Sequence, residues 1–314
     1  MSSDSTQNRI PLWRQILQST VLIIRSHSLH FYALSILFLL PIFFTLVVYP
    51  SFHLALFHPH YNFNISTQPQ FSHSSFEIIV FLMLTVLVVV FFLCAIATIT
   101  YSSVQPFHDR SINLVSSIKS IRNSFIPLLS TFIILHSIFL SITIIFTLVF
   151  VFLLQNLGLT ELKYNSNHFW FLLILVIVPI LLWLELNWSL AYVIAAAEYK
   201  CGFETLRRSA YLMKGMRWLA FWTHLFYWLT LGGMVIGSNV VFVLLGAGKG
   251  DHWRSFSFIG QTVQCTVLGA LGMNQVLVFN GVLYMYSKDL KGEKLPFDYI
   301  SLPLGDEKKN HNIV

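Results

Sequence analysis

The segment IIVFLMLTVLVVVFFLCAIATIT, residues 78–100, decides the fold class of this chain. It contains no Asp, Glu, Lys or Arg, and a helix of about 20 apolar residues is long enough to cross the hydrocarbon core of a bilayer. Five further runs are similar in length and composition. The sequence therefore predicts an all-α, polytopic membrane protein whose six spans form a bundle, at about residues 31–49, 78–100, 126–154, 169–197, 218–245 and 259–286.

The composition excludes a water-soluble protein. Of the 314 residues, 56% are hydrophobic and only 10% are charged, whereas an average soluble domain has about 25% charged residues. Three cysteines are too few for a disulfide framework. The net charge of +6 does not indicate a nucleic-acid partner, because the position of the basic residues relative to the spans decides what they meet.

The distribution of basic residues predicts the orientation in the membrane. All but three of the 19 lie on the side of the two termini, and the exceptions are Lys163, Lys249 and Arg254. By the positive-inside rule both termini are cytosolic, residues 1–30 and 288–314 are cytosolic segments, and residues 31–287 form the membrane domain. The sequence Asn64-Ile65-Ser66 then lies on the opposite side, so Asn64 is a candidate glycosylation site.

This orientation favours a secretory-pathway endomembrane or the plasma membrane. The alternative is an organellar membrane, because the first 30 residues are rich in Ser and Arg and contain one acid, Asp4, as transit peptides often do.

Three amphipathic stretches precede the odd-numbered spans and predict cytosolic interfacial helices. Each has an apolar stripe at helical spacing beside basic residues. Together they suggest a threefold repeat of interfacial helix, span, outer loop and span. The stripes are Ile10, Trp13, Leu17, Val21 and Ile24, then Leu114, Ile118, Ile121 and Phe125, then Phe203, Leu206, Ala210 and Met213.

The best-marked segment is EYKCGFETLRRSAYLMKGMRW, residues 198–218. It resembles a family of plant multi-pass membrane proteins of unknown function, and it is similar to bacterial multi-pass proteins and to the membrane domain associated with glycerophosphodiester phosphodiesterases. No phosphodiesterase catalytic domain accompanies it here, so the resemblance does not imply that activity. Thr205 stands where the family often has alanine. The matching positions are Glu198, Gly202, Leu206, Arg207, Arg208, Ser209, Leu212 and Gly215.

The same segment has a physical interpretation. Gly202 is expected to end the fourth span with a left-handed residue, since glycine adopts that conformation without penalty. A basic surface then faces the cytosol, where each cation gains about 1 kcal/mol from anionic headgroups. This surface either binds lipids or a protein partner or is only a structural corner. Its cations are Arg207, Arg208, Lys214 and Arg217.

Cys201 lies beside this surface, next to the membrane. It is a candidate for palmitoylation, and the alternative is an inert thiol.

Glu185 is the single carboxylate inside a predicted span. An acid at the centre of a span costs about 2.5 to 3.5 kcal/mol, so a partner or water is expected beside it. One interpretation is a substrate or proton site, and the other is interhelical hydrogen bonding that fixes packing. The candidate members of this polar site are Glu185, Asn187, Asn274, Gln275 and Asn280, with His136 and Tyr192 as further neighbours.

No catalytic pattern is found. The chain has no phosphate-binding loop, no H-E-x-x-H and no G-x-S-x-G. His53, His58, His60 and His73 cluster in the first outer connection, but without Cys or Asp they do not predict a metal site. No cofactor is expected either.

The favoured function is therefore non-enzymatic. The sequence predicts a protein that organises or binds lipids or other membrane proteins through its basic cytosolic face, within the lipid bilayer and without nucleic acid. The alternative is a small-molecule or proton-coupled transporter with a mid-membrane site around Glu185. The oligomeric state stays open.

Overall fold

The computed structural model describes residues 11–57, 75–108, 113–156, 167–246 and 256–293, and every element in these ranges is helical. The elements are α1 (Leu12–Ser26), α2 (Ser28–Leu34), the π-helix η1 (Ser35–Leu39), α3 (Leu40–Phe57), α4 (Ser75–Val104), the 3₁₀-helix η2 (Gln105–His108), α5 (Leu114–Asn156), α6 (Asn167–Trp188), α7 (Ala191–Glu198), α8 (Phe203–Leu212), α9 (Arg217–Gly246) and α10 (Phe256–Leu290).

Six helical segments of this structure are long and apolar enough to cross a membrane, which confirms the prediction of six such helices. The first segment is continuous through α2, η1 and α3, and the fourth combines α6 and α7. The others lie in α4, α5, α9 and α10. This protein is therefore an integral membrane protein.

Helix α10 is the centre of the packing. Every residue from 276 to 287 is buried, and these residues pack with α1, α3, α4 and α7 in the main apolar cluster. A helix that is apolar on all faces has no preferred outward side and is suited to such a position. The last turns of α10 are thus enclosed by protein, not by lipid.

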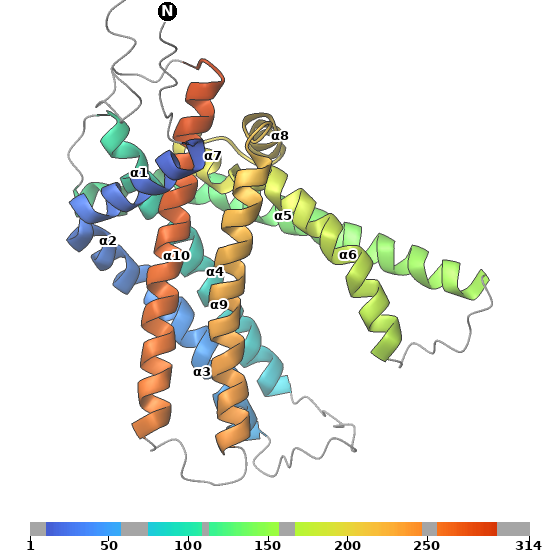
Figure 1. Cartoon of the computed structure of the whole chain (residues 1–314). Helices are drawn as coiled ribbons and strands as arrows, with labels where there is room; N and C mark the ends of the chain where they lie inside the picture. Colours follow the sequence, from blue (N-terminus) through green and yellow to red (C-terminus); the bar gives the residue numbers. More distant parts are fainter. Residues whose placement is uncertain (1–10, 58–74, 109–112, 157–166, 247–255, 294–314) are drawn as a thin grey trace, which may run out of the picture.

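Helix α1 forms as expected, but it presents a different face to the protein. Figure 1 shows α1 lying across α10, beside its last turns. There the Ser19 hydroxyl hydrogen-bonds the Tyr286 hydroxyl at 3.0 Å, and Ile16 and Ile23 are buried. Trp13 and Val21 of the predicted apolar stripe are 47% and 57% exposed. The small polar side chains face the protein because α1 packs closely against α10.

Helix α5 also differs from the expectation. The predicted interfacial helix at residues 114–125 and the span at 126–154 form a single 43-residue helix that continues through Pro127. Its buried face carries Ser117, Ser120 and Ser124, whereas Ile118 of the predicted apolar stripe is exposed. Small residues allow close helix contact in membranes, which explains the reversal. The threefold repeat stays a prediction, since this unit has no separate first helix.

Helices α5 and α6 form a hairpin that extends away from α3, α9 and α10 (Figure 1). At its far end Leu173 and Ile177 of α6 are buried against Phe146 and Phe150 of α5. Near the other end α6 approaches α9, and the two helices line a common space around Glu185.

Helices α4 and α10 approach closely at Gly281. A Cβ atom added at this glycine would lie 2.1 Å from the Ser103 Oγ, which is inside van der Waals contact. Ser103 itself is fully buried and donates a hydrogen bond to the Thr100 carbonyl, so it has little freedom to move.

Gly281→Val is therefore expected to destabilise the protein by about 1–3 kcal/mol through overpacking. Gly260→Val on the same helix is the matched control, because Gly260 is exposed and has no neighbouring atom within 4 Å of the added Cβ. The measurement is the free energy of unfolding in mixed detergent micelles. Equal stability of the two variants would contradict the close α4–α10 contact.

Candidate functional site

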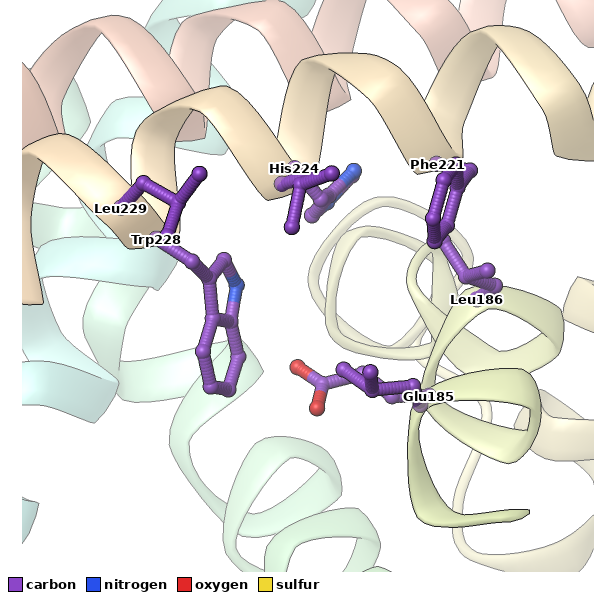
Figure 2. A pocket seen from close by; sticks show the side chains of 8 residues that line it. Glu185, Leu186, Phe221, His224, Trp228 and Leu229 are labelled. Atoms are coloured by element: carbon purple, nitrogen blue, oxygen red, sulfur yellow. The ribbon is translucent and has the colours of Figure 1, made fainter. Parts of the chain in front are cut away.

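A cavity of about 270 Å³ lies between α6 and α9. Its walls are mostly apolar and aromatic, and only Glu185 and His224 bring ionisable groups. Figure 2 shows the carboxylate of Glu185 pointing from α6 into this space, toward α9 and the Trp228 ring. The lining residues are Leu182, Glu185 and Leu186 from α6, and Phe221, His224, Leu225, Trp228 and Leu229 from α9.

The Glu185 carboxylate has no hydrogen-bond or ion-pair partner within the described part of the chain. A polar group in a span is normally paired with another side chain or faces water. Here the carboxylate faces the cavity instead, so the cavity contents determine whether its charge is compensated.

His224 is held in one tautomer by its own helix. Its Nδ1 lies 2.8 Å from the Ala220 carbonyl oxygen, which can only accept, so Nδ1 carries the proton and donates. In the neutral ring Nε2 is then an acceptor. The Glu185 carboxylate thus offers acceptors to a ligand, whereas the Nδ1–H donor of His224 is already used within α9.

The cavity lies beside a break in the fourth span. Helix α6 ends at Trp188 and α7 begins at Ala191. Ser209 of α8 closes the break: its Oγ donates to the Asn187 carbonyl at 2.9 Å and accepts from the Leu190 amide at 3.2 Å. Irregular backbone at membrane depth is tolerated only when its polar groups are satisfied within the protein. Ser209 therefore permits a discontinuous helix one turn beyond Glu185.

The structure does not bring the predicted polar residues together around Glu185. The Asn187 side chain donates to the Trp183 carbonyl of its own helix at 2.7 Å. On α10, Asn274 and Asn280 are buried, each with an unpaired Oδ1, and Gln275 is exposed. None of these four lines the cavity.

The two further candidate neighbours do not line the cavity, although Tyr192 lies close enough to Glu185 to interact with it electrostatically. His136 is exposed on α5 and bonds the Phe132 carbonyl of its own helix. Tyr192 on α7 packs edge-on against Phe92 of α4. Two residues of α9, His224 and Trp228, do face Glu185 across the cavity. Neither of them was predicted from the sequence. An ionisable ring inside the fifth span was the signal that could have indicated His224.

A second polar site, the charged cluster, joins the end of α7, α8 and the end of α10. Glu198 lies 3.5 Å from the Arg208 guanidinium and 3.5 Å from the Lys288 ammonium, and it accepts a hydrogen bond from Tyr284 at 2.8 Å. Arg208 also pairs with Glu293. The cluster consists of Glu198, Arg208, Lys288 and Glu293, and Lys200 adds a third cation 3.9 Å from Glu198.

The charged cluster changes the expectation for the basic surface. Arg208 is not free for headgroups, because its hydrogen bond to Glu293 holds it and raises the pKa of its guanidinium. Arg207 and Lys214 are exposed. Arg217 is exposed too, with its guanidinium 5.9 Å from the centre of the Trp183 ring.

The motif residues around α8 have structural roles, with one correction. Gly202 does not end the fourth span: Tyr199, at φ 55°, is the left-handed residue after α7, and Gly202, at φ 62°, begins α8. Glycine is needed there for a second reason, because a Cβ would lie 2.5 Å from Ile134 of α5. Leu206 and Leu212 lie on the buried face of α8. Gly215, at φ 102°, allows the chain to turn between α8 and α9.

The remaining candidates are the predicted modification sites and the histidines of the first outer connection. Cys201 is an exposed free thiol in the turn between α7 and α8, so it is accessible to modification. Asn64, His58, His60 and His73 lie outside the described residues. Within the described ranges no group of three His, Cys, Asp or Glu side chains is placed to hold a metal ion.

Comparison with models of known protein families assigns the chain to one family. The family model described as "Domain of unknown function (DUF8558)" matches residues 9–301. The chain belongs to this family. No curated protein and no solved structure matches it. The DUF8558 match includes both the cavity between α6 and α9 and the charged cluster, and its description assigns no activity. The resemblance of residues 198–218 to the other multi-pass proteins stays a prediction.

The charged cluster generates a stability prediction with adjacent arginines as test and control. Arg208→Met is expected to lower the free energy of unfolding by about 1–2 kcal/mol, because Glu198 and Glu293 lose one of the two cations that they share, and Lys288 alone remains between them. Arg207→Met, on the exposed side of α8, should change it by less than about 0.5 kcal/mol. Chemical unfolding in mixed micelles measures both. A larger loss in Arg207→Met would exclude this role for the cluster.

Proposed function

We propose that this protein is a non-enzymatic membrane protein that binds a lipid-like molecule in the cavity between α6 and α9, with Glu185 as the polar anchor. One observation carries the proposal: an unpaired carboxylate inside a span opens into a cavity of about 270 Å³. No chemical step is assigned to the site.

A purely structural role for Glu185 is less well supported. Interhelical hydrogen bonding would require a partner side chain. His224 of α9 lines the same cavity, but its hydrogen bond goes to the Ala220 carbonyl, and Asn187, Asn274, Gln275 and Asn280 do not line the cavity. An uncompensated acid costs about 2.5 to 3.5 kcal/mol, so an apolar residue at this position would pack with less penalty. An acid at this position is therefore better explained by a ligand that binds it.

The walls of the cavity suit a lipid-like molecule. Four leucines, two from each helix, surround the carboxylate: Leu182, Leu186, Leu225 and Leu229. At the rim, Trp228 and Leu229 are exposed to the surroundings of α9, which in a span are lipid. A chain can therefore enter from the bilayer while its polar group reaches Glu185.

Transport of the bound molecule is the alternative form of this function. The discontinuous fourth span favours it, because transporter sites are often built beside broken helices. In this form the hairpin of α5 and α6 would move relative to α9.

A second candidate function is recognition of anionic headgroups or a membrane-protein partner at the basic face. The exposed Arg207, Lys214 and Arg217 favour it. This candidate assumes the proposed orientation, with α1, α8 and the end of α10 at the cytosolic surface of a secretory-pathway endomembrane or the plasma membrane.

Native mass spectrometry of the protein released from lipid nanodiscs tests the main proposal. The wild-type protein should co-release one small amphipathic species in about one-to-one ratio, and Glu185→Gln should retain at most about a tenth of it, because a lost charge-assisted hydrogen bond is worth about 1.5–3 kcal/mol. Gln275→Ala is the control, since Gln275 lies in a span but outside the cavity.

Equal retention by the wild-type and Glu185→Gln proteins would contradict a site at Glu185. The same spectra report the second candidate. If the basic face binds headgroups, Arg207→Met should release less anionic lipid than the wild type while the small species stays unchanged.

A further inference from the structure

From the chemistry of the cavity we infer the class of its ligand: a single-chain amphipathic amine, whose ammonium group lies on the Glu185 carboxylate beside the Trp228 ring. This inference rests on the proposed function and specifies which lipid-like molecule the site selects. It depends on the charge of the lining residues, on their aromatic rings and on the size of the cavity.

The charge of the cavity calls for a cation from outside the protein. Glu185 is an acid and the lining contains no Lys or Arg. His224 uses its Nδ1–H on the Ala220 carbonyl, so this donor is not available to a ligand. An ammonium group carries donors only, so it matches the negatively charged acceptor oxygens of Glu185.

Aromatic rings add to this preference. Phe221 and Trp228 line the same cavity as the carboxylate, and Figure 2 shows the Trp228 ring beside it. A cation over an indole ring is stabilised by the negative face of the π-system, most strongly away from water. A carboxylate with neighbouring rings is thus a chemical match for an organic ammonium ion.

Metal ions and phospholipids fit less well. A hard metal cation takes about six oxygen ligands, and the lining supplies one carboxylate. A zwitterionic phospholipid headgroup would bring a phosphate anion close to Glu185, with no basic side chain in the lining to meet it. An amine without an accompanying anion avoids this repulsion.

The size of the cavity favours one alkyl chain. A volume of about 270 Å³ is near the lower limit of small-molecule pockets, which begin at about 300 Å³. It accommodates the ammonium group and the first methylene groups among the leucines. The rest of the chain can leave past Leu229, which is 68% exposed at the rim, into the bilayer.

Photolabelling with three matched probes tests this assignment on the full chain in neutral maltoside micelles. The probes are a long-chain primary amine, the alcohol and the carboxylic acid of equal chain length, each with a diazirine in the alkyl chain. Peptide mass spectrometry locates the label. The amine should label peptides of α6 and α9 at least about tenfold more than the alcohol, and Glu185→Gln should abolish that difference.

Two tryptophans of α9 provide the matched pair that separates binding from misfolding. Trp222 and Trp228 are 54% and 55% exposed, but only Trp228 lines the cavity. Trp228→Leu should reduce amine labelling several-fold, and Trp222→Leu should leave it unchanged. Both variants keep an apolar residue at an exposed position, so both are expected to fold.

The outcomes distinguish the two levels of the proposal. Equal labelling by amine and alcohol, lost in Trp228→Leu, would overturn the amine assignment and leave a lipid-binding cavity. Preferential labelling by the acid would also overturn it. Labelling of α6 and α9 no greater than that of other exposed spans, with every probe, would overturn the proposed function as well.

Discussion

Two hydrogen bonds made by Ser209 hold together the part of the structure on which the candidate site depends. In a bilayer, backbone groups that leave a helix must find partners within the protein. The fourth span leaves its helix between α6 and α7, and the Ser209 hydroxyl of α8 satisfies the Asn187 carbonyl and the Leu190 amide at once. This contact lets α6 turn away from the bundle while Glu185 still faces α9.

The position of α8 depends in turn on the residues that mark its sequence. The charged cluster fastens Arg208 to the ends of α7 and α10, and Gly202 allows α8 to approach α5. Thr131 of α5 accepts a hydrogen bond from the Gly202 amide at 3.2 Å. The motif of residues 198–218 is thus explained by the geometry of a corner, and the candidate binding site lies next to it instead of within it.

The sequence predicted the six membrane-spanning helices because length and lack of charge are sufficient for that inference. It did not predict which faces are buried. In α1 and α5 the small polar residues Ser19, Ser117 and Ser124 are buried beside apolar ones, while Val21 and Ile118 are exposed. A soluble helix would bury its large apolar residues first, but lipid solvates apolar side chains and close packing favours small ones.

The candidate site was predictable only in part, and for the same reason. Glu185 was identifiable because an acid in a span is costly. Its neighbours were not, because α6 and α9 carry apolar residues on all faces and give no sign of their rotation about the helix axis. Asn274 and Asn280 have the expected polarity but lie in α10, away from the cavity, whereas His224 and Trp228 of α9 complete it.

Disulfide cross-linking in native membranes tests most directly which face of α6 lies against which face of α9. In a chain with Cys94, Cys201 and Cys265 replaced by Ser, we predict that Leu186→Cys and Phe221→Cys, which line the same cavity, cross-link efficiently under mild oxidation. Leu186→Cys with Trp222→Cys, one residue further and outside the cavity, should not. Equal cross-linking of both pairs, or none at 186 and 221, would contradict the account.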